Sequence, residues 1–306
     1  MATVSVVIPT YNRRDLLIRA IESVLAQSVA PAEIIIVDDG STDGTEEALR
    51  PLGSRIIYVR TGNRGISAAR NAGAGMATGE WIAYLDNDDA FMPQKIERYL
   101  ASAEEVGSSA RFVFSDFTRV LLDSGEALLK SQSRLYPVIY SLMRRRSEVT
   151  YTADSQHSLR LMLLGYRMYP SVFMVHRDVH RHLVWDEQPG IGEDLLFGLH
   201  ASQLTGFCYV DEPTTVIGVH GGNVSNNREF MLRGHIAALE AFLSTVRDGT
   251  RREVDAAVGR ALCRLGYYYR ETGAFGKARA TYRLALRRRG GRTAALRGSM
   301  LAMLGR

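Results

Sequence analysis

The chain has 306 residues, of which 46% are hydrophobic and 23% charged, so it can bury a core of ordinary size and is not expected to be disordered. Two cysteines are too few for a disulfide framework or a four-cysteine zinc site. The chain contains no apolar run of about 18 residues, and its first residues lack the pattern of a secretory signal. We therefore expect a cytoplasmic protein.

The net charge of +5 is unevenly distributed along the chain. Residues 250–306 contain 14 Lys and Arg against 3 Asp and Glu, a net charge of +11, which leaves −6 on residues 1–249. The basic tail lacks the aromatic platforms of proteins that bind single-stranded nucleic acid. We therefore expect no nucleic-acid partner.

The first half of the chain alternates short β-rich runs with helical patterns, which predicts an α/β fold with a mostly parallel, Rossmann-like sheet flanked by helices. In chain order we predict strands at 4–8, 33–39, 55–59 and 81–85, and helices at 16–25 and 66–77. Polar residues follow three of these strands directly. In open α/β sheets ligands bind at the carboxyl ends of the strands, so we expect a site at that edge.

The second half is less regular until its helical end. We predict strands at 111–122 and 171–175, a loop at 144–146, a helix at 193–204 and a third tail helix at 296–304. From about residue 254 the pattern is wholly helical, and its Gly, Ala and Tyr spacings partly resemble one tetratricopeptide hairpin. One repeat cannot form a solenoid, so an all-helical appendage is favoured over a partner-binding array. We predict a main domain at 1–245 and a basic helical extension at 250–306.

The acidic segment Asp86-Asn87-Asp88-Asp89 is the strongest chemical signal in the sequence. Three carboxylates at one strand end repel one another and lose hydration unless a cation holds them. Oxygen ligands of this kind suit Mg²⁺ or Mn²⁺ carrying substrate phosphates. A solvated acidic turn is the alternative, and the other polar groups expected at the same edge favour the cation site.

Two further polar groups are expected at this edge. Asp38 and Asp39 follow the second strand, where carboxylates can accept hydrogen bonds from a nucleobase or ribose, or cap the next helix. Pro9, Tyr11 and Asn12 follow the first strand. A rigid turn there would present Tyr11 for stacking on a base, and an ordinary loop tyrosine is the alternative.

Four segments occur in order along the chain: residues 4–12 (VSVVIPTYN), 36–43 (IVDDGSTD), 67–73 (SAARNAG) and 84–89 (YLDNDD). They resemble the successive motifs of the family 2 glycosyltransferases, which have the GT-A fold. The resemblance implies inverting transfer of a sugar from a nucleotide-diphosphate donor, with a UDP-sugar as the favoured donor. The acceptor would be a hydroxyl of a cell-envelope or exopolysaccharide precursor, a saccharide or lipid-linked saccharide, and the cofactor Mn²⁺ or Mg²⁺.

The resemblance also implies roles for individual residues. It assigns nucleotide-sugar binding to Pro9, Tyr11, Asn12, Asp38, Asp39, Arg70, Asp86 and Asn87. It assigns metal binding to Asp88, Asp86 and His220, with Asp89 in support. Asp194 would take the proton of the acceptor hydroxyl, and Glu193 would position Asp194 or the acceptor. A helix N-terminus would favour the same two acids on structural grounds alone.

The chain departs from the family pattern at one position. Gly218 stands where relatives carry an arginine, two residues before His220, which leaves one phosphate contact open. We expect Arg70 or one of the arginines 144–146 to supply this contact.

Two alternatives remain open from the sequence. Arginines of the tail lie at helical spacing with Tyr282, Leu284 and Leu286, which suits either a peripheral contact of residues 279–297 with an anionic membrane or a solvated basic face. The alternative to an active enzyme is a catalytically inactive nucleotide-sugar-binding protein of the same fold.

Overall fold

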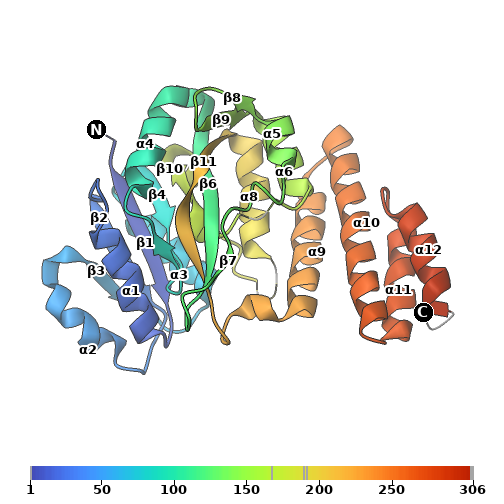
Figure 1. Cartoon of the computed structure of the whole chain (residues 1–306), viewed down its shortest axis with the longest axis horizontal. Helices are drawn as coiled ribbons and strands as arrows, with labels where there is room; N and C mark the ends of the chain where they lie inside the picture. The colour runs from blue at the N-terminus through green and yellow to red at the C-terminus, as the bar shows by residue number, and fades with distance from the viewer. Residues whose placement is uncertain (1, 167, 189, 191, 304–306) are drawn as a thin grey trace. The chain divides into compact units, whose positions relative to one another are not determined.

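The computed structural model describes residues 2–166, 168–188, 190 and 192–303 (Figure 1). The chain forms two compact units. The first comprises residues 1–161, 166–187 and 200–221. The second comprises residues 162–165, 188–199 and 222–306.

The first unit is built on one sheet with the strand order β3-β2-β1-β4-β10-β6-β11-β9-β8, with β5 beside β11 and β7 beside β6. The strands are β1 (Val4–Thr10), β2 (Glu33–Asp38), β3 (Ile57–Arg60), β4 (Trp81–Tyr84), β5 (Ala90–Phe91), β6 (Ala110–Leu121), β7 (Ala127–Leu129), β8 (Arg144–Arg145), β9 (Thr150–Ala153), β10 (Phe173–His176) and β11 (Gly206–Val219). Strands β1 to β4 pair in parallel, as do β6 and β11, whereas β10 and the short strands pair antiparallel.

Helices flank this sheet, as the sequence predicts (Figure 1). They are α1 (Arg14–Leu25), α2 (Thr45–Leu49), α3 (Ile66–Met76), α4 (Lys95–Val106), α5 (Val138–Leu142), α6 (Ser155–Leu163) and α7 (Arg177–His180). Helix α8 (Glu193–Leu204) begins in the second unit and ends in the first. Helix α3 packs on β1 and β2, and α4 packs on β6 and β11. The α/β class is therefore confirmed.

Strand β1 lies at the centre of the parallel part of the sheet. All seven of its residues are buried, which is why its sequence is a continuous apolar run instead of an alternating one. Its register pairs Thr10 with Asp38 of β2 and Val7 with Tyr84 of β4. The loops that follow these three strands therefore start at one edge of the sheet.

Several elements of the structure differ from the sequence prediction or are missing from it, and β8 and β11 are two of them. Residues 144–145, expected in a loop, form β8 at the far edge of the sheet. The fourteen-residue strand β11 has no counterpart in the prediction. Polar residues and Pro213 interrupt its apolar pattern, and the sheet accommodates Pro213 at a register shift between Val210 and Thr215.

The second unit contains the helices that end the chain, which confirms the predicted helical tail. They are α9 (Arg228–Thr245), α10 (Asp248–Glu271), α11 (Phe275–Leu286) and α12 (Arg292–Met303). Tyr282 of α11 is 2% exposed, and its ring lies against Gly266 of α10 and Gly298 of α12. Helix α9 belongs to the same compact unit as these helices. The second unit therefore begins before the boundary at 245–250 that we predict between the main domain and the helical extension. The tetratricopeptide likeness stays a prediction.

Among the helices of the described residues, none combines the length and the apolar composition of a membrane-spanning segment.

Gly73 of α3 packs closely against Val7 of β1, and this contact generates a stability prediction. A Cβ at residue 73 would lie 2.4 Å from Cγ1 of buried Val7. We expect Gly73→Ala to lower the free energy of unfolding by about 1–3 kcal/mol, because the core would be overpacked. Urea denaturation measures the change.

Gly75→Ala is the matched control in the same helix, because a Cβ at residue 75 meets no atom within 4 Å. We expect it to be neutral or to raise stability by up to about 1 kcal/mol, since alanine favours helix over glycine. Equal effects of the two substitutions would contradict the packing argument.

Candidate active site

The structure brings the three predicted loops together at the edge formed by β1, β2 and β4. The side-chain amide of Asn87 donates to the Pro9 carbonyl at 3.2 Å and to Thr10 Oγ1 at 3.4 Å. The backbone N–H of Asp39 donates to the Thr10 carbonyl at 2.8 Å. Asn87 and Asp39 thus tie the second and third loops to the end of β1.

Asn12 connects the first loop to the second. Its backbone N–H donates to Ser41 Oγ at 2.8 Å, and its side-chain oxygen accepts the N–H of Thr42 at 2.7 Å. The backbone of Asn12 has φ +50°, a conformation that asparagine adopts more readily than most residues. Beside it, Tyr11 is 44% exposed, and its stacking on a base stays a prediction.

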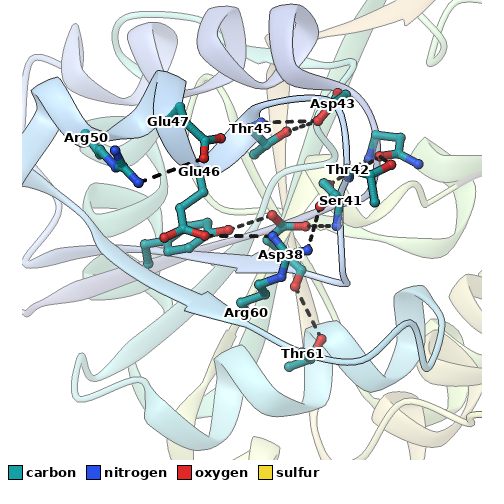
Figure 2. A network of polar contacts seen from close by, with 12 residues as sticks. Asp38, Ser41, Thr42, Asp43, Thr45, Glu46, Glu47, Arg50, Arg60 and Thr61 are labelled. Atoms are coloured by element: carbon teal, nitrogen blue, oxygen red, sulfur yellow. Dashed lines mark hydrogen bonds and ion pairs between the residues drawn. The ribbon is translucent and has the colours of Figure 1, made fainter.

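Asp38 holds the second loop in place from inside the protein (Figure 2). Its Oδ1 accepts the N–H of Ser41 at 2.8 Å, and its Oδ2 accepts the hydroxyl of Tyr58 at 2.6 Å. Burial, with the carboxylate of Asp38, raises the pKa of Tyr58, which therefore stays a proton donor. Both oxygens of Asp38 are engaged in folding the loop.

Asp39 organises the turn that leads into α3. Its Oδ1 accepts from Thr61 Oγ1 at 2.8 Å and from the N–H of Arg64 at 2.9 Å, and its Oδ2 accepts the N–H of Gly65 at 2.6 Å. A carboxylate offers about four acceptor positions, and these donors occupy three of them. The predicted nucleoside contact of Asp39 stays a prediction.

Arg70, predicted to face a diphosphate, is bound to Asp86 in the structure. Its guanidinium donates from Nη2 to Asp86 Oδ1 at 2.7 Å and lies over the ring of Trp185 at 4.6 Å. The residue is 1% exposed. The backbone N–H of Asp86 donates to Ser171 Oγ at 2.9 Å. The ion pair and this hydrogen bond fix the first acid of the cluster.

Asp88 and His220 converge from different strand ends. Oδ2 of Asp88 lies 3.1 Å from Nε2 of His220. Burial and the charge of Asp86 raise the pKa of Asp88, and His220 opposes the rise. A Cβ at residue 218 would lie 2.0 Å from the Asp88 carbonyl oxygen, so only glycine fits there without a backbone shift. This close approach accounts for a glycine at residue 218 in this chain.

Asp89 is buried beneath this pair. Its Oδ2 accepts the hydroxyl of Ser171 at 2.5 Å, and its Oδ1 accepts the N–H of Gly218 at 2.9 Å. Burial and the two neighbouring acids raise the pKa of Asp89 well above its usual range. Sequence reasoning missed Ser171, which no local pattern marks because it comes from the segment just before β10.

Asp88 and His220 are the members of the predicted metal set that the structure brings together. Asp86 pairs with Arg70 instead. Among the described side chains, no group of three or more His, Cys, Asp and Glu has the arrangement of a metal site. A carboxylate and an imidazole suit Mn²⁺, and Mg²⁺ characteristically takes few protein ligands, with phosphate oxygens and water for the rest. The pair fits such an ion as a partial ligand set.

The arginines at 144–146 lie far from this site. Arg145 donates to the carbonyls of Ser147 and Glu148, and β8 reaches β11 through β9 at residues 207–210. At about 3.3 Å per residue, Gly218 lies roughly 26 Å beyond Val210 along β11. The expectation that these arginines supply the open phosphate contact is therefore wrong.

Comparison with known proteins identifies the family. A model described as glycosyl transferase family 2 matches residues 5–162, more than half of the chain. The chain belongs to glycosyltransferase family 2. It is 33% identical over 246 residues to the succinoglycan biosynthesis protein ExoO of Rhizobium meliloti, covering 78% of this chain and 68% of ExoO. The chain is also 47% identical over 114 residues to an uncharacterised glycosyltransferase of Rickettsia felis. This match covers 37% of the present chain and only 18% of the Rickettsia protein.

Solved structures confirm the GT-A fold of this family 2 glycosyltransferase. TarS 1–349 of S. aureus in complex with UDP superposes with a TM-score of 0.66 at 16% identity, covering 99% of this chain and 92% of that TarS fragment. The mannosyltransferase PcManGT of Pyrobaculum calidifontis, in complex with GDP-Man and Mn²⁺, superposes with a TM-score of 0.61 at 18% identity. The match covers 99% of this chain and 80% of the PcManGT chain. At these identities the likeness shows the fold alone.

In this glycosyltransferase, Glu193 and Asp194 begin helix α8 in the second unit. Oδ1 of Asp194 accepts the N–H of Leu195 at 2.7 Å. The N–H of Gly192 donates to the Gly234 carbonyl at 3.0 Å, which joins the start of α8 to α9. Two acids in a first turn also suit the helix dipole. Their catalytic roles stay predictions.

Ser171 generates a prediction because one hydroxyl serves two acids. We expect Ser171→Ala to lower the free energy of unfolding by about 1.5–3 kcal/mol, since a buried carboxylate loses its donor and the N–H of Asp86 loses its acceptor. Urea denaturation measures the change. The matched control is Ser102→Ala, where the hydroxyl pairs with the neutral hydroxyl of Thr150 at 3.1 Å. We expect that change to cost about 0.5–1.5 kcal/mol. A Ser171 effect no larger than the Ser102 effect would contradict this account.

Proposed function

We propose that the chain transfers a sugar from a nucleotide-diphosphate donor to an acceptor hydroxyl with inversion at the anomeric carbon. A UDP-sugar is the favoured donor. The observation that carries the proposal is the convergence of three polar loops on one sheet edge, where Asp88 meets His220 at 3.1 Å. TarS 1–349 was solved in complex with UDP and with UDP-GlcNAc, and PcManGT in complex with GDP-Man and Mn²⁺. These complexes support a nucleotide-sugar donor here.

The loops would divide the donor among them. Tyr11, 44% exposed, would stack on the base, and Asp39 would accept a hydrogen bond from a base N–H or a ribose hydroxyl. Asp86 and Asn87 would bind the ribose side of the donor. Asp88 and His220 would hold Mn²⁺ or Mg²⁺, which when bound would neutralise charge on the diphosphate leaving group.

The transfer itself needs a base. The acceptor oxygen forms its bond to the anomeric carbon as the bond from that carbon to the diphosphate oxygen breaks, and the hydroxyl proton goes to the base. We assign this role to the Asp194 carboxylate, with Glu193 positioning it or the acceptor. One displacement at the opposite face inverts the configuration.

We propose a cell-envelope or exopolysaccharide precursor as the acceptor, either a saccharide or a lipid-linked saccharide. ExoO is named for succinoglycan biosynthesis. TuaG of Bacillus subtilis, 37% identical over 125 residues, is named as a putative teichuronic acid glycosyltransferase. Both names refer to polysaccharide biosynthesis, which supports the same class of product here.

We also propose that helix α11 binds the anionic face of a membrane. Arg279, Arg283 and Arg287 recur every four residues and so share one side of the helix, and exposed Leu284 lies beside them. Arg288, grouped with them from the sequence, instead pairs with Asp255 at 3.1 Å and with Glu240. Arginines with an exposed leucine suit a headgroup surface.

A thermal-shift screen of UDP, GDP, dTDP and CMP, each with and without Mn²⁺, tests the donor site. We expect one nucleotide to raise the melting temperature more in the presence of Mn²⁺ than in its absence, and we expect this nucleotide to be UDP. Ligand binding stabilises by RT ln(1 + [L]/Kd), about 2.7 kcal/mol at a hundredfold excess over Kd. No shift with any nucleotide would sink the proposal.

The variant Asp194→Asn separates binding from chemistry in the same screen. We expect the wild-type thermal shift and a loss of transfer by at least about a hundredfold, the usual contribution of a general base. Glu271→Gln, at the end of α10, is the control and should keep both. A nucleotide shift without transfer in the wild type, over a range of saccharide acceptors, would support the inactive binding protein instead.

Co-sedimentation with vesicles tests the membrane proposal. We expect the wild type to bind vesicles of anionic lipid and not neutral ones. Arg283→Gln combined with Arg287→Gln should weaken that binding by tenfold or more, at about 1 kcal/mol per basic residue. Arg19→Gln with Arg55→Gln removes the same charge from exposed sites elsewhere and should have little effect. Equal binding to both vesicle types would contradict the proposal.

A further inference from the structure

We propose that Trp185 is a positioning residue that holds the Arg70 guanidinium on Asp86 and thereby sets nucleotide affinity. The inference rests on the proposed binding role of Asp86. Trp185 lies in the segment before α8, outside the four family-like motifs, and its indole ring lies 4.6 Å beneath the Arg70 guanidinium.

The backbone of Trp185 is held by the side chain of one residue on α3. The Asn71 side-chain oxygen accepts the N–H of Trp185 at 2.9 Å, and the Asn71 amide donates to the Trp185 carbonyl, also at 2.9 Å. Asn71 directly follows Arg70 in the chain. The same turn of α3 therefore presents the guanidinium and anchors the residue whose ring supports it.

Aromatic neighbours hold the indole ring from the other directions. It meets the ring of Tyr84 edge-to-face at 5.1 Å and stacks on Phe173 at 6.1 Å. Tyr84 ends β4, two residues before Asp86. The indole is thus fixed to the strand that carries the acidic cluster and to β10 beside it.

The dry surroundings make the cation–π contact strong. Trp185 and Arg70 are each 1% exposed. Such a contact is worth most when water is excluded, and tryptophan is the most effective partner. Nη2 of Arg70 is the atom that reaches Asp86 Oδ1, at 2.7 Å. Without the ring beneath it, the guanidinium could tilt away, and Asp86 would lose its fixed counter-charge and its orientation toward the donor.

Trp185→Leu tests this chain of contacts, because leucine retains apolar bulk and removes the ring face. Calorimetric titration of the full chain with UDP and with GDP, each with Mn²⁺, gives Kd, and urea unfolding gives stability. We expect nucleotide Kd to rise ten- to thirtyfold. A role in packing alone would lower stability without moving Kd of the remaining folded protein.

Trp81→Leu is the matched control. Trp81 is the chain's other tryptophan, is 6% exposed, and begins the same strand β4. It contacts His176 edge-to-face at 5.0 Å. We expect it to lower stability to a similar extent while nucleotide Kd changes less than twofold.

A double-mutant cycle shows whether the effect passes through Arg70. On an Arg70→Met background, Trp185→Leu should change nucleotide Kd no further, because the guanidinium it positions is gone. If Trp185→Leu does not fold, Trp185→Phe replaces it. Phenylalanine keeps a smaller ring, so we expect about a threefold rise in Kd, again absent with Arg70→Met.

The outcomes separate the two proposals. Wild-type affinity in both Trp185 variants, or an equal loss with and without Arg70→Met, overturns the inference and leaves the proposed function standing. A wild-type protein that binds neither nucleotide overturns the proposed function, and the inference with it.

Discussion

The site depends on one constraint, the placement of three carboxylates within four residues at the end of a buried strand. Carboxylates so close together raise one another's pKa values and cost desolvation unless each is matched. Asp86, Asp88 and Asp89 meet this constraint with separate partners. In that order the partners are the Arg70 guanidinium, the His220 imidazole, and the Ser171 hydroxyl with the Gly218 N–H.

The topology of the sheet supplies these partners. Arg70 comes from α3, Ser171 from the segment before β10, and Gly218 and His220 from the end of β11. Strand β10 pairs directly with β4, and β5, which follows the acidic loop at once, pairs with β11. The acidic loop is therefore held between two strands that lie far from it in sequence. The missing side chain of Gly218 lets the loop approach β11 that closely.

Sequence patterns succeeded where the signal is local. The apolar runs of β1, β2 and β4 are continuous because those strands are buried on both faces, and helix α8 was predicted with its observed bounds. The patterns failed where pairing is long-range. Strand β11 carries Pro213 and acidic residues in its middle, and the arginines at 144–145 form an edge strand instead of a loop. A propensity contains no information about which neighbour a segment will find.

The sequence alone determined the fold class, the family and which loops carry polar chemistry, because apolar periodicity and short motifs are written in neighbouring residues. Only the tertiary structure decided how each acid is used. Asp38 turned out to accept a hydrogen bond from its own loop and Asp39 from the turn before α3. Arg70 turned out to pair with Asp86, and Trp185 to lie beneath the Arg70 guanidinium. These contacts join residues that are from 3 to 115 positions apart in the sequence. Hydrogen bonds and cation–π contacts depend on the distance between groups in space, and the spacing of residues along the chain does not determine that distance.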